Sequence, residues 1–275
     1  MKYFFIPLTI LLFACSDNKT VKVKGSDTEV NLAVQLAESF HRYKPSLFIS
    51  VSGGGSGLGI ASLLNGNADI ANASRRINEK EMALFREKGI VLDSFIFAQD
   101  AIAFIVADDL PLASISTRQL ADLLSGKVRN WEPIAGKRLP VNIYGRQSNS
   151  GTHDFVKNRL HISFSPAAKQ MNGNAQILEA IRADHSGIGY VGAGYVIHGV
   201  TKGIKVLPVY TTDRNAAVSP LDAAKIAEGA YFFQRPLFQY FRAKDSLQVR
   251  PFIAFEKSPE GQKIINVGGY YPAKK

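Results

Sequence analysis

The segment 52–59, with the sequence SGGGSGLG, constrains the fold of this 275-residue chain more than any other. Five of its eight residues are glycine. An apolar run at 47–51 precedes it, and apolar residues at helical spacing (Leu58, Ala61, Leu64) follow it. A glycine turn between a strand and a helix exposes backbone N–H groups to a ligand, since no side chain blocks the approach. The segment therefore predicts an anion-binding turn at the N-terminus of a helix.

The same order of strand, turn and helix recurs through the first hundred residues. Apolar alternation predicts strands, and apolar residues three or four positions apart predict helices. We expect strands at 21–24, 47–51 and 69–74, with helical segments at 32–40, 58–65 and 79–88. This repetition is typical of an α/β fold in which helices cover a parallel sheet.

The remainder of the chain contains two long apolar segments and a second polar turn. Segment 95–107 is long enough to cross between two lobes, and 231–241 is an aromatic-rich strand candidate that contains Pro236. Between them, a predicted strand at 141–144 leads into the polar turn 145–152, whose sequence is GRQSNSGT.

Three strand-to-helix turns have the chemistry of an oxyanion site: 25–28, 52–59 and 148–152. Each carries hydroxyl groups and free N–H groups at a helix N-terminus, where the helix dipole favours negative charge. Serine and threonine are also common helix caps, so each turn taken alone has a purely structural explanation. Three turns of one kind favour a shared anion.

Two arginines lie close to these turns in the sequence. Arg146 precedes Ser150 by four residues and can donate two parallel hydrogen bonds to an oxyanion. Arg75 comes directly after a predicted strand, where α/β proteins place ligand contacts. We expect the neighbouring Arg76 to be solvated.

Composition and motif content bear on other classes of function. The net charge is +10, but the basic residues are scattered and form no nucleic-acid-binding motif, so we expect no nucleic-acid partner. The sequence contains no motif that predicts a metal or a cofactor. A serine hydrolase with Ser150 as nucleophile and His153 or His185 as base stays an alternative, although no G-x-S-x-G motif surrounds Ser150.

The N-terminus has the features of an export signal. Residues 1–14 combine a short basic start with an apolar run that is too short to span a bilayer. Cys15 is the only cysteine, so no intrachain disulfide can form. The sequence LFAC at 12–15 resembles a bacterial lipoprotein signal. That resemblance implies cleavage before Cys15, lipidation of Cys15, and a tether at 15–20 that anchors an extracytoplasmic globular body.

From about Val23 to Pro272, the chain resembles the phosphate-binding proteins of bacterial phosphate ABC transporters. The motifs that carry the resemblance occur in family order: GSDT at 25–28, SGGGSGLGI at 52–60, NGNADIANASR at 65–75, GR at 145–146, SGT at 150–152, GIGYV at 187–191, RPLF at 235–238, SPEGQ at 258–262 and GYYP at 269–272.

The resemblance implies an α/β fold of the two-lobed periplasmic-binding-protein clamshell type (type II). Each lobe would contain a mixed sheet flanked by helices, and two strands would cross between the lobes. The implied division gives 21–97 plus 231–275 to lobe 1 and 98–230 to lobe 2. Two of the three turns would then lie on lobe 1 and the third on lobe 2, so that closure of the lobes completes the site.

The resemblance also implies the residues that contact phosphate. The matching positions are Thr28, the N–H of Glu29, Ser56, Arg146, Ser150, Gly151 and Thr152. Ser74, followed by Arg75, stands where well-studied members have an aspartate. That aspartate accepts a hydrogen bond from protonated phosphate and repels sulfate. Asp27 is a candidate replacement acceptor, or alternatively a helix N-cap.

These observations together predict a monomeric, lipid-anchored, extracytoplasmic protein that binds inorganic phosphate. It would catalyse nothing and would deliver the ion to an ABC permease in the membrane. The alternative is the same fold holding another oxyanion, such as sulfate, or acting as a sensor.

Overall fold

The computed structural model describes residues 19–197, 202–212 and 216–273. Cys15 and the predicted signal segment lie outside the described residues. Within these ranges, no helix is both long enough and apolar enough to cross a membrane.

A single mixed sheet runs through the whole molecule. Its strands follow the order β2-β1-β3-β11-β4-β8-β6-β7, and β9 and β12 also pair with β4. The strands of this sheet are β1 (Lys19–Gly25), β2 (Leu47–Ser52), β3 (Ile70–Ala73), β4 (Leu92–Ala107), β6 (Asn142–Arg146), β7 (Lys169–Met171), β8 (Gly187–Gly192), β9 (Ile204–Leu207), β11 (Gln234–Arg242) and β12 (Tyr271–Pro272). A separate pair is formed by β5 (Ile115–Ser116) and β10 (Val209–Tyr210).

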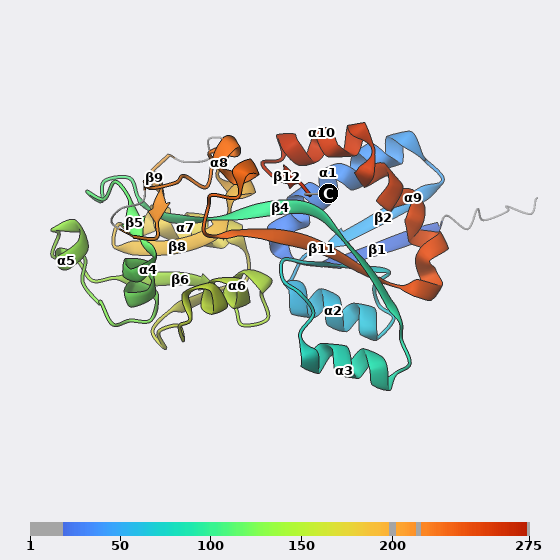
Figure 1. Cartoon of the computed structure of the whole chain (residues 1–275), viewed down its shortest axis with the longest axis horizontal. Coiled ribbons are helices and arrows are strands. Elements are labelled where there is room, and N and C mark those ends of the chain that lie inside the picture. The colour runs from blue at the N-terminus through green and yellow to red at the C-terminus, as the bar shows by residue number, and fades with distance from the viewer. Residues whose placement is uncertain (1–18, 198–201, 213–215, 274–275) are drawn as a thin grey trace, which may run out of the picture.

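Strand β4 joins two lobes because its two halves have different partners. Residues from Leu92 to Ala101 pair with β11, whereas Ile102 to Ala107 pair with β8 or β9. Figure 1 shows β4 and β11 running side by side from one lobe into the other. The long apolar segment predicted at 95–107 is thus confirmed as a crossing strand, and it begins three residues earlier, at Leu92.

The first lobe is built from the repeated unit that the sequence predicts. β1 pairs in parallel with both β2 and β3, as expected, and the antiparallel partner β11 makes the sheet mixed. Its helices are α1 (Val30–Tyr43), α2 (Ser56–Leu64), α3 (Glu79–Glu87), α9 (Ser246–Lys257) and α10 (Pro259–Val267). Leu36 and Phe40 lie one turn apart on α1 and are fully buried, and the Phe40 ring meets Phe252 of α9 edge-on.

The second lobe packs around β4, β6 and β8. Its helices are α4 (Thr117–Leu124), α5 (Glu132–Ala135), α6 (Gly151–Leu160), α7 (Asn174–Ala183) and α8 (Ala223–Glu228). Trp131 and Phe104 are among its largest buried side chains. α6 begins at Gly151, so the end of the second polar turn forms the first turn of this helix. β8 ends at Gly192, and a 3-10 turn (η2, Ala193–Tyr195) follows it.

Candidate functional site

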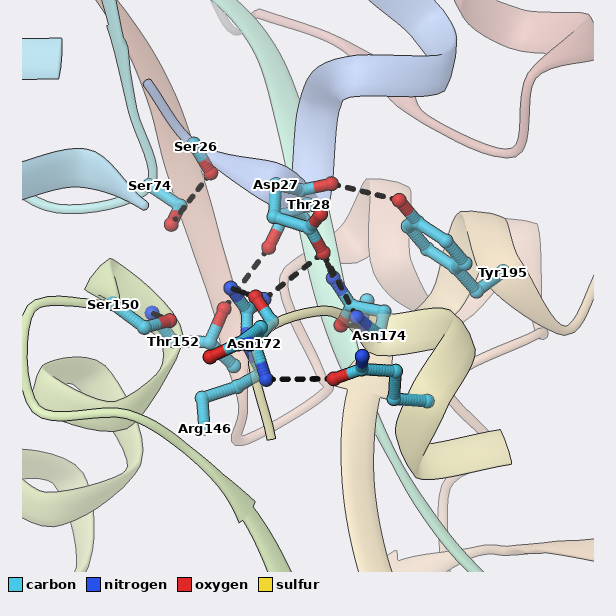
Figure 2. A network of polar contacts seen from close by, with 12 residues as sticks. Ser26, Asp27, Thr28, Ser74, Arg146, Ser150, Thr152, Asn172, Asn174 and Tyr195 are labelled. Carbon is cyan, nitrogen blue, oxygen red and sulfur yellow. Dashed lines mark hydrogen bonds and ion pairs between the residues drawn. The ribbon is translucent and has the colours of Figure 1, made fainter. Parts of the chain in front are cut away.

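The three predicted turns meet between the two lobes. The first, after β1, contains the 3-10 turn η1 (Asp27–Glu29); the second precedes α2, and the third caps α6. Figure 2 shows Ser26, Asp27 and Thr28 of the first turn facing Ser150 and Thr152 of the third turn and Arg146 at the end of β6. Segments more than 120 residues apart in sequence thereby form one polar cluster, as Thr28 and Thr152 show.

Three serine hydroxyls of the first lobe form a short chain. Ser26 Oγ donates to Ser74 Oγ over 3.1 Å, and Ser74 Oγ lies 3.4 Å from Ser56 Oγ. The backbone N–H of Ser74 donates to Ser56 Oγ at 3.1 Å. All three serines are at least 96% buried. The structure therefore places Ser74, directly after β3, beside the glycine-turn serine.

Gly151 brings the second lobe onto this chain of hydroxyls. A Cβ at position 151 would lie 2.4 Å from Ser56 Oγ and 2.6 Å from Ser74 Oγ, well inside contact distance. Only a residue without a side chain allows this approach. Ser150, the residue before it, caps α6 by accepting the N–H of Thr152 at 3.2 Å.

The threonines of the first and third turns are linked by a buried arginine from a crossing strand. Thr28 Oγ1 and Thr152 Oγ1 lie 2.9 Å apart, and Arg235 Nη2 donates to them at 3.1 and 3.0 Å. Arg235 is 1% exposed and also donates from Nε and Nη2 to Asp100 at 3.0 and 2.8 Å. Burial raises the pKa of Asp100, and the charge of Arg235 opposes this effect.

Sequence reasoning gave Arg235 no place in the site, although a signal was present. Arg235 and Asp100 are opposite charges inside two apolar segments, and they pair in register across β11 and β4. A buried charge requires a partner. The two apolar segments 95–107 and 231–241, which carry one charge each, could therefore have been paired from the sequence.

Arg146 is held by groups from both lobes. Its Nη1 donates to Asp27 Oδ2 at 3.2 Å, and Nη2 donates to the carbonyl oxygen of Asn172 at 2.9 Å (Figure 2). The side chain is 1% exposed, and burial lowers its pKa although the charge of Asp27 opposes this. Arg146 stays charged because an arginine pKa starts above 12.

Asp27 is an inter-lobe acceptor, and its alternative assignment as a helix N-cap is wrong. The N-cap positions of η1 and α1 are Ser26 and Glu29. Besides Arg146, Asp27 Oδ2 accepts the backbone N–H of Asn174 at 2.8 Å and its Nδ2 at 2.6 Å. One carboxylate oxygen thus takes three donors from the opposite lobe, an arrangement that stabilises the closed form.

Arg75 points to carboxylates. Both of its Nη atoms donate to Glu81 at 2.7 Å, and its Nε lies 3.0 Å from Asp154 Oδ2 on α6. Burial lowers the pKa of Arg75, but the hydrogen bond and charge of Glu81 together with Asp154 outweigh it, so the pKa lies above its ordinary value. Arg75 therefore bridges the lobes beside the hydroxyl chain. Arg76 is exposed, as predicted.

The glycine turn contacts the opposite lobe through its backbone. Gly57 N–H donates to the carbonyl oxygen of Asn149 at 3.0 Å, and Asn149 Nδ2 donates to the carbonyl oxygen of Gly54 at 3.3 Å. Gly55 N–H donates to the carbonyl oxygen of Gly25 at 2.8 Å. The expectation that the glycines mainly offer N–H groups to an anion needs correction, because these two groups are already paired within the protein. The turn contributes the Ser56 hydroxyl and a close contact between lobes.

The geometry does not favour a serine hydrolase. Ser150 Oγ accepts a backbone N–H, and the His153 ring packs at a tilt against Phe164 with centroids 4.7 Å apart. His185 is exposed and its Nδ1 lies 3.0 Å from Asp109 Oδ1. Neither histidine is in position to take a proton from Ser150.

Comparison with known proteins agrees with this architecture. A family model for the PBP superfamily domain matches residues 16–260. The phosphate-binding protein PstS of Borreliella burgdorferi is 27% identical over 283 residues, which cover 98% of this chain and 97% of that protein. The protein of the same name from Staphylococcus epidermidis is 28% identical over 284 residues, covering 97% and 86% of the two chains.

A solved structure has the same fold. It is the phosphate ABC transporter substrate-binding protein of Clostridium perfringens, determined with bound phosphate, and it superposes with a TM-score of 0.82. The superposition covers 93% of this chain and all of that chain, at 23% sequence identity. Since the family model spans most of the sequence and the two-lobed α/β fold agrees with it, this chain belongs to the PBP superfamily.

Proposed function

We propose that this protein binds inorganic phosphate between its lobes and delivers it to the membrane permease of an ABC transporter. The observation that carries the proposal is the convergence of five hydroxyl side chains and two buried arginines on one point between the lobes. The hydroxyls belong to Thr28, Ser56, Ser74, Ser150 and Thr152, and the arginines are Arg146 and Arg235. The named functions of the relatives from Borreliella burgdorferi and Staphylococcus epidermidis support it.

The charges of the site are nearly balanced before any ligand is counted. Arg146 faces Asp27, and Arg235 faces Asp100. Binding would therefore depend on preorganised hydrogen-bond donors more than on net positive charge. Although Arg235 is paired with Asp100, its charge still polarises the two threonine hydroxyl groups that it contacts.

The threonine pair illustrates how a donor is kept available. Arg235 Nη2 has two protons, and since one goes to Asp100 the other is shared between Thr28 Oγ1 and Thr152 Oγ1. Between the two threonines only one hydroxyl proton is needed for their mutual bond. The second hydroxyl proton is free to be donated to an oxyanion. With Ser56, Ser74, Ser150 and the first turn of α6, it forms the donor set that we assign to phosphate.

This arrangement serves binding and release, and we propose no chemical change of the ligand. Closure brings the third turn onto the first two, and opening separates Asp27 from Arg146 and Asn174. We place the lobe boundaries at 21–97 plus 231–275 and at 98–230, which puts the hinge within β4 and ahead of β11. We further propose that the protein is monomeric, that Cys15 carries the lipid anchor, and that the globular body lies outside the cytoplasm.

Isothermal titration calorimetry on the purified protein tests the function directly. Phosphate should bind with a measurable heat at neutral pH, and a competition series with sulfate, molybdate and phosphonates then measures the selectivity. Absence of heat with phosphate would contradict the proposal, and a stronger response to sulfate would favour the other-oxyanion alternative. Cys15→Ser should release the protein from the membrane fraction if the lipid assignment is correct, while leaving phosphate affinity unchanged.

A further inference from the structure

The first turn contains a capping-box sequence that is not used as one. Ser26 and Glu29 have the S-x-x-E spacing in which serine normally accepts the N–H of the third residue and glutamate reaches back to the serine N–H. Here Ser26 makes no side-chain cap bond, and its N–H donates to the carbonyl oxygen of Asn72 at 2.9 Å. Both side chains are thus available for a different role.

Glu29 is a fully buried acid whose two carboxylate oxygens have no hydrogen-bond partner of normal geometry. Burial raises the pKa of Glu29 well above its ordinary value, and the Ser26 hydroxyl, the strongest opposing influence, lowers it. The charged and titratable groups that interact electrostatically with it are Arg235 on β11, Asp100 on β4, Glu256 on α9 and Tyr270 after α10.

Glu29 and Ser26 lie in one turn, where the backbone N–H of Glu29, the group expected to contact phosphate, donates to the carbonyl oxygen of Ser26 at 3.2 Å. Ser26 also joins the hydroxyl chain of the site. Its Oγ lies 3.1 Å from Ser74 Oγ, which in turn contacts Ser56. Each serine hydroxyl has one proton, so a hydroxyl that donates in one direction accepts from the other. The hydrogen bonds along Glu29, Ser26 and Ser74 can therefore run in either of two directions. The protonation state of the Glu29 carboxyl determines which direction they take.

We propose that Glu29 is a specificity-determining positioning residue, which sets whether Ser74 donates to, or accepts from, the oxyanion in the site. The proposal rests on the proposed function and adds to it the basis of selectivity. Neutral Glu29 donates to Ser26, Ser26 donates to Ser74, and the Ser74 proton points to the ligand. Ionised Glu29 accepts from Ser26, Ser26 accepts from Ser74, and a lone pair of Ser74 faces the ligand.

The two directions of hydrogen bonding favour different ligands. Sulfate has no proton and needs donors at every oxygen, so it fits the neutral form of Glu29. Hydrogen phosphate carries a proton that needs an acceptor, so it fits the ionised form. Selectivity for phosphate over sulfate should therefore rise with pH. Glu29 would act through Ser26 in a site where Ser74 occupies the position of an acceptor carboxylate.

The test is calorimetric titration of the purified full-length protein with phosphate and with sulfate across mildly acidic to mildly basic pH. The ratio of the two association constants, corrected for the ionisation of free phosphate, should change about tenfold in the wild type. That is the factor expected from one hydrogen bond to a charged group. Glu29→Gln keeps the shape of the side chain but cannot titrate. Ser26→Ala interrupts the series of hydrogen bonds but keeps the acid. Both should make the ratio independent of pH.

A matched control is Ser39→Ala, which removes another buried serine hydroxyl, one that donates to Glu260 at 3.0 Å away from the site. It should keep the wild-type dependence on pH. A dependence that survives in both Glu29→Gln and Ser26→Ala would overturn the proposal, as would a wild-type ratio that does not change with pH while phosphate still binds. Failure of the wild type to bind phosphate at any pH would instead contradict the proposed function itself.

Discussion

The two buried arginines of the site, Arg235 and Arg146, have similar burial but different attachments. Arg235 and its partner Asp100 lie opposite each other on β11 and β4, the strands that both lobes share. Arg146 lies on β6 in the second lobe, whereas its partner Asp27 belongs to the first. The Arg235–Asp100 pair therefore belongs to the two crossing strands, β4 and β11, which we call the frame, and it persists when the lobes separate. The Arg146–Asp27 pair exists only when the lobes meet.

This difference separates stability from ligand response. A charge pair within the frame is fixed at folding, so its loss should affect the free energy of unfolding whether or not ligand is present. A pair across the cleft contributes to the free energy of closure, so its loss should affect affinity. The following substitutions test that division, in order of decreasing effect.

Arg235→Met should destabilise the folded protein by about 3–5 kcal/mol, because it leaves Asp100 fully buried without its counter-charge. Urea unfolding followed by circular dichroism measures the change. The double variant Arg235→Met with Asp100→Leu removes both charges and should recover much of the loss. A single variant as stable as the wild type would place Arg235 outside the frame.

Arg146→Ala should weaken phosphate binding by about 2–4 kcal/mol, since it removes a charged donor from a closed site. Its effect on unfolding should be smaller than that of Arg235→Met, because the carboxylate it leaves behind is 19% exposed. Calorimetry and urea unfolding on the same preparation give both numbers. Equal losses of affinity and stability in the two variants would contradict the division of roles between the two ion pairs.

Glu256, a buried acid on α9, makes the stability of the folded protein depend on pH. Burial raises the pKa of Glu256 to about 8, although its bond from Gln239 Nε2 at 2.8 Å opposes the shift. The folded state therefore binds a proton more tightly than the unfolded chain does. Stability is greatest below the ordinary glutamate pKa and falls as pH rises toward 8. We expect a loss on the order of 2 kcal/mol over that window, since water entry relieves part of a burial-driven shift.

The control for that measurement is Glu256→Gln, which cannot titrate. Its unfolding free energy should be flatter between mildly acidic and mildly basic pH than that of the wild type. An identical slope in the two proteins would show that another group is responsible.

Asp154→Asn should have the smallest effect of the series, about 0.2–1 kcal/mol on phosphate affinity. It removes the inter-lobe contact with Arg75, but Asp154 is 33% exposed and Arg75 keeps Glu81. The contact should be weakened by added salt, unlike that of Arg146. An effect as large as that of Arg146→Ala would show that both edges of the cleft hold it closed equally.

Features that depend on residues close together in the sequence could be predicted, whereas contacts between distant segments could not. The hydroxyls of Ser56 and Ser150 could be located because turn chemistry and helix starts are local. The partners Asn149 and Asn174 could not, because they reach the first lobe only through the tertiary fold. The environment of the Glu29 carboxyl was equally hidden, since a polar residue beside a turn gives no sign of being fully buried.

Gly151 gives the closed form a defined limit. One methyl group at this position would meet the oxygens of Ser56 and Ser74 at less than 2.7 Å, so either the hydroxyls rotate away or the lobes stop short. With glycine at this position, the backbone of residue 151 can approach the two serine hydroxyls as closely as any residue type allows. The absence of a Cβ atom at residue 151 thus helps to set how far the lobes can close. Larger side chains at this position should hold the lobes progressively further apart.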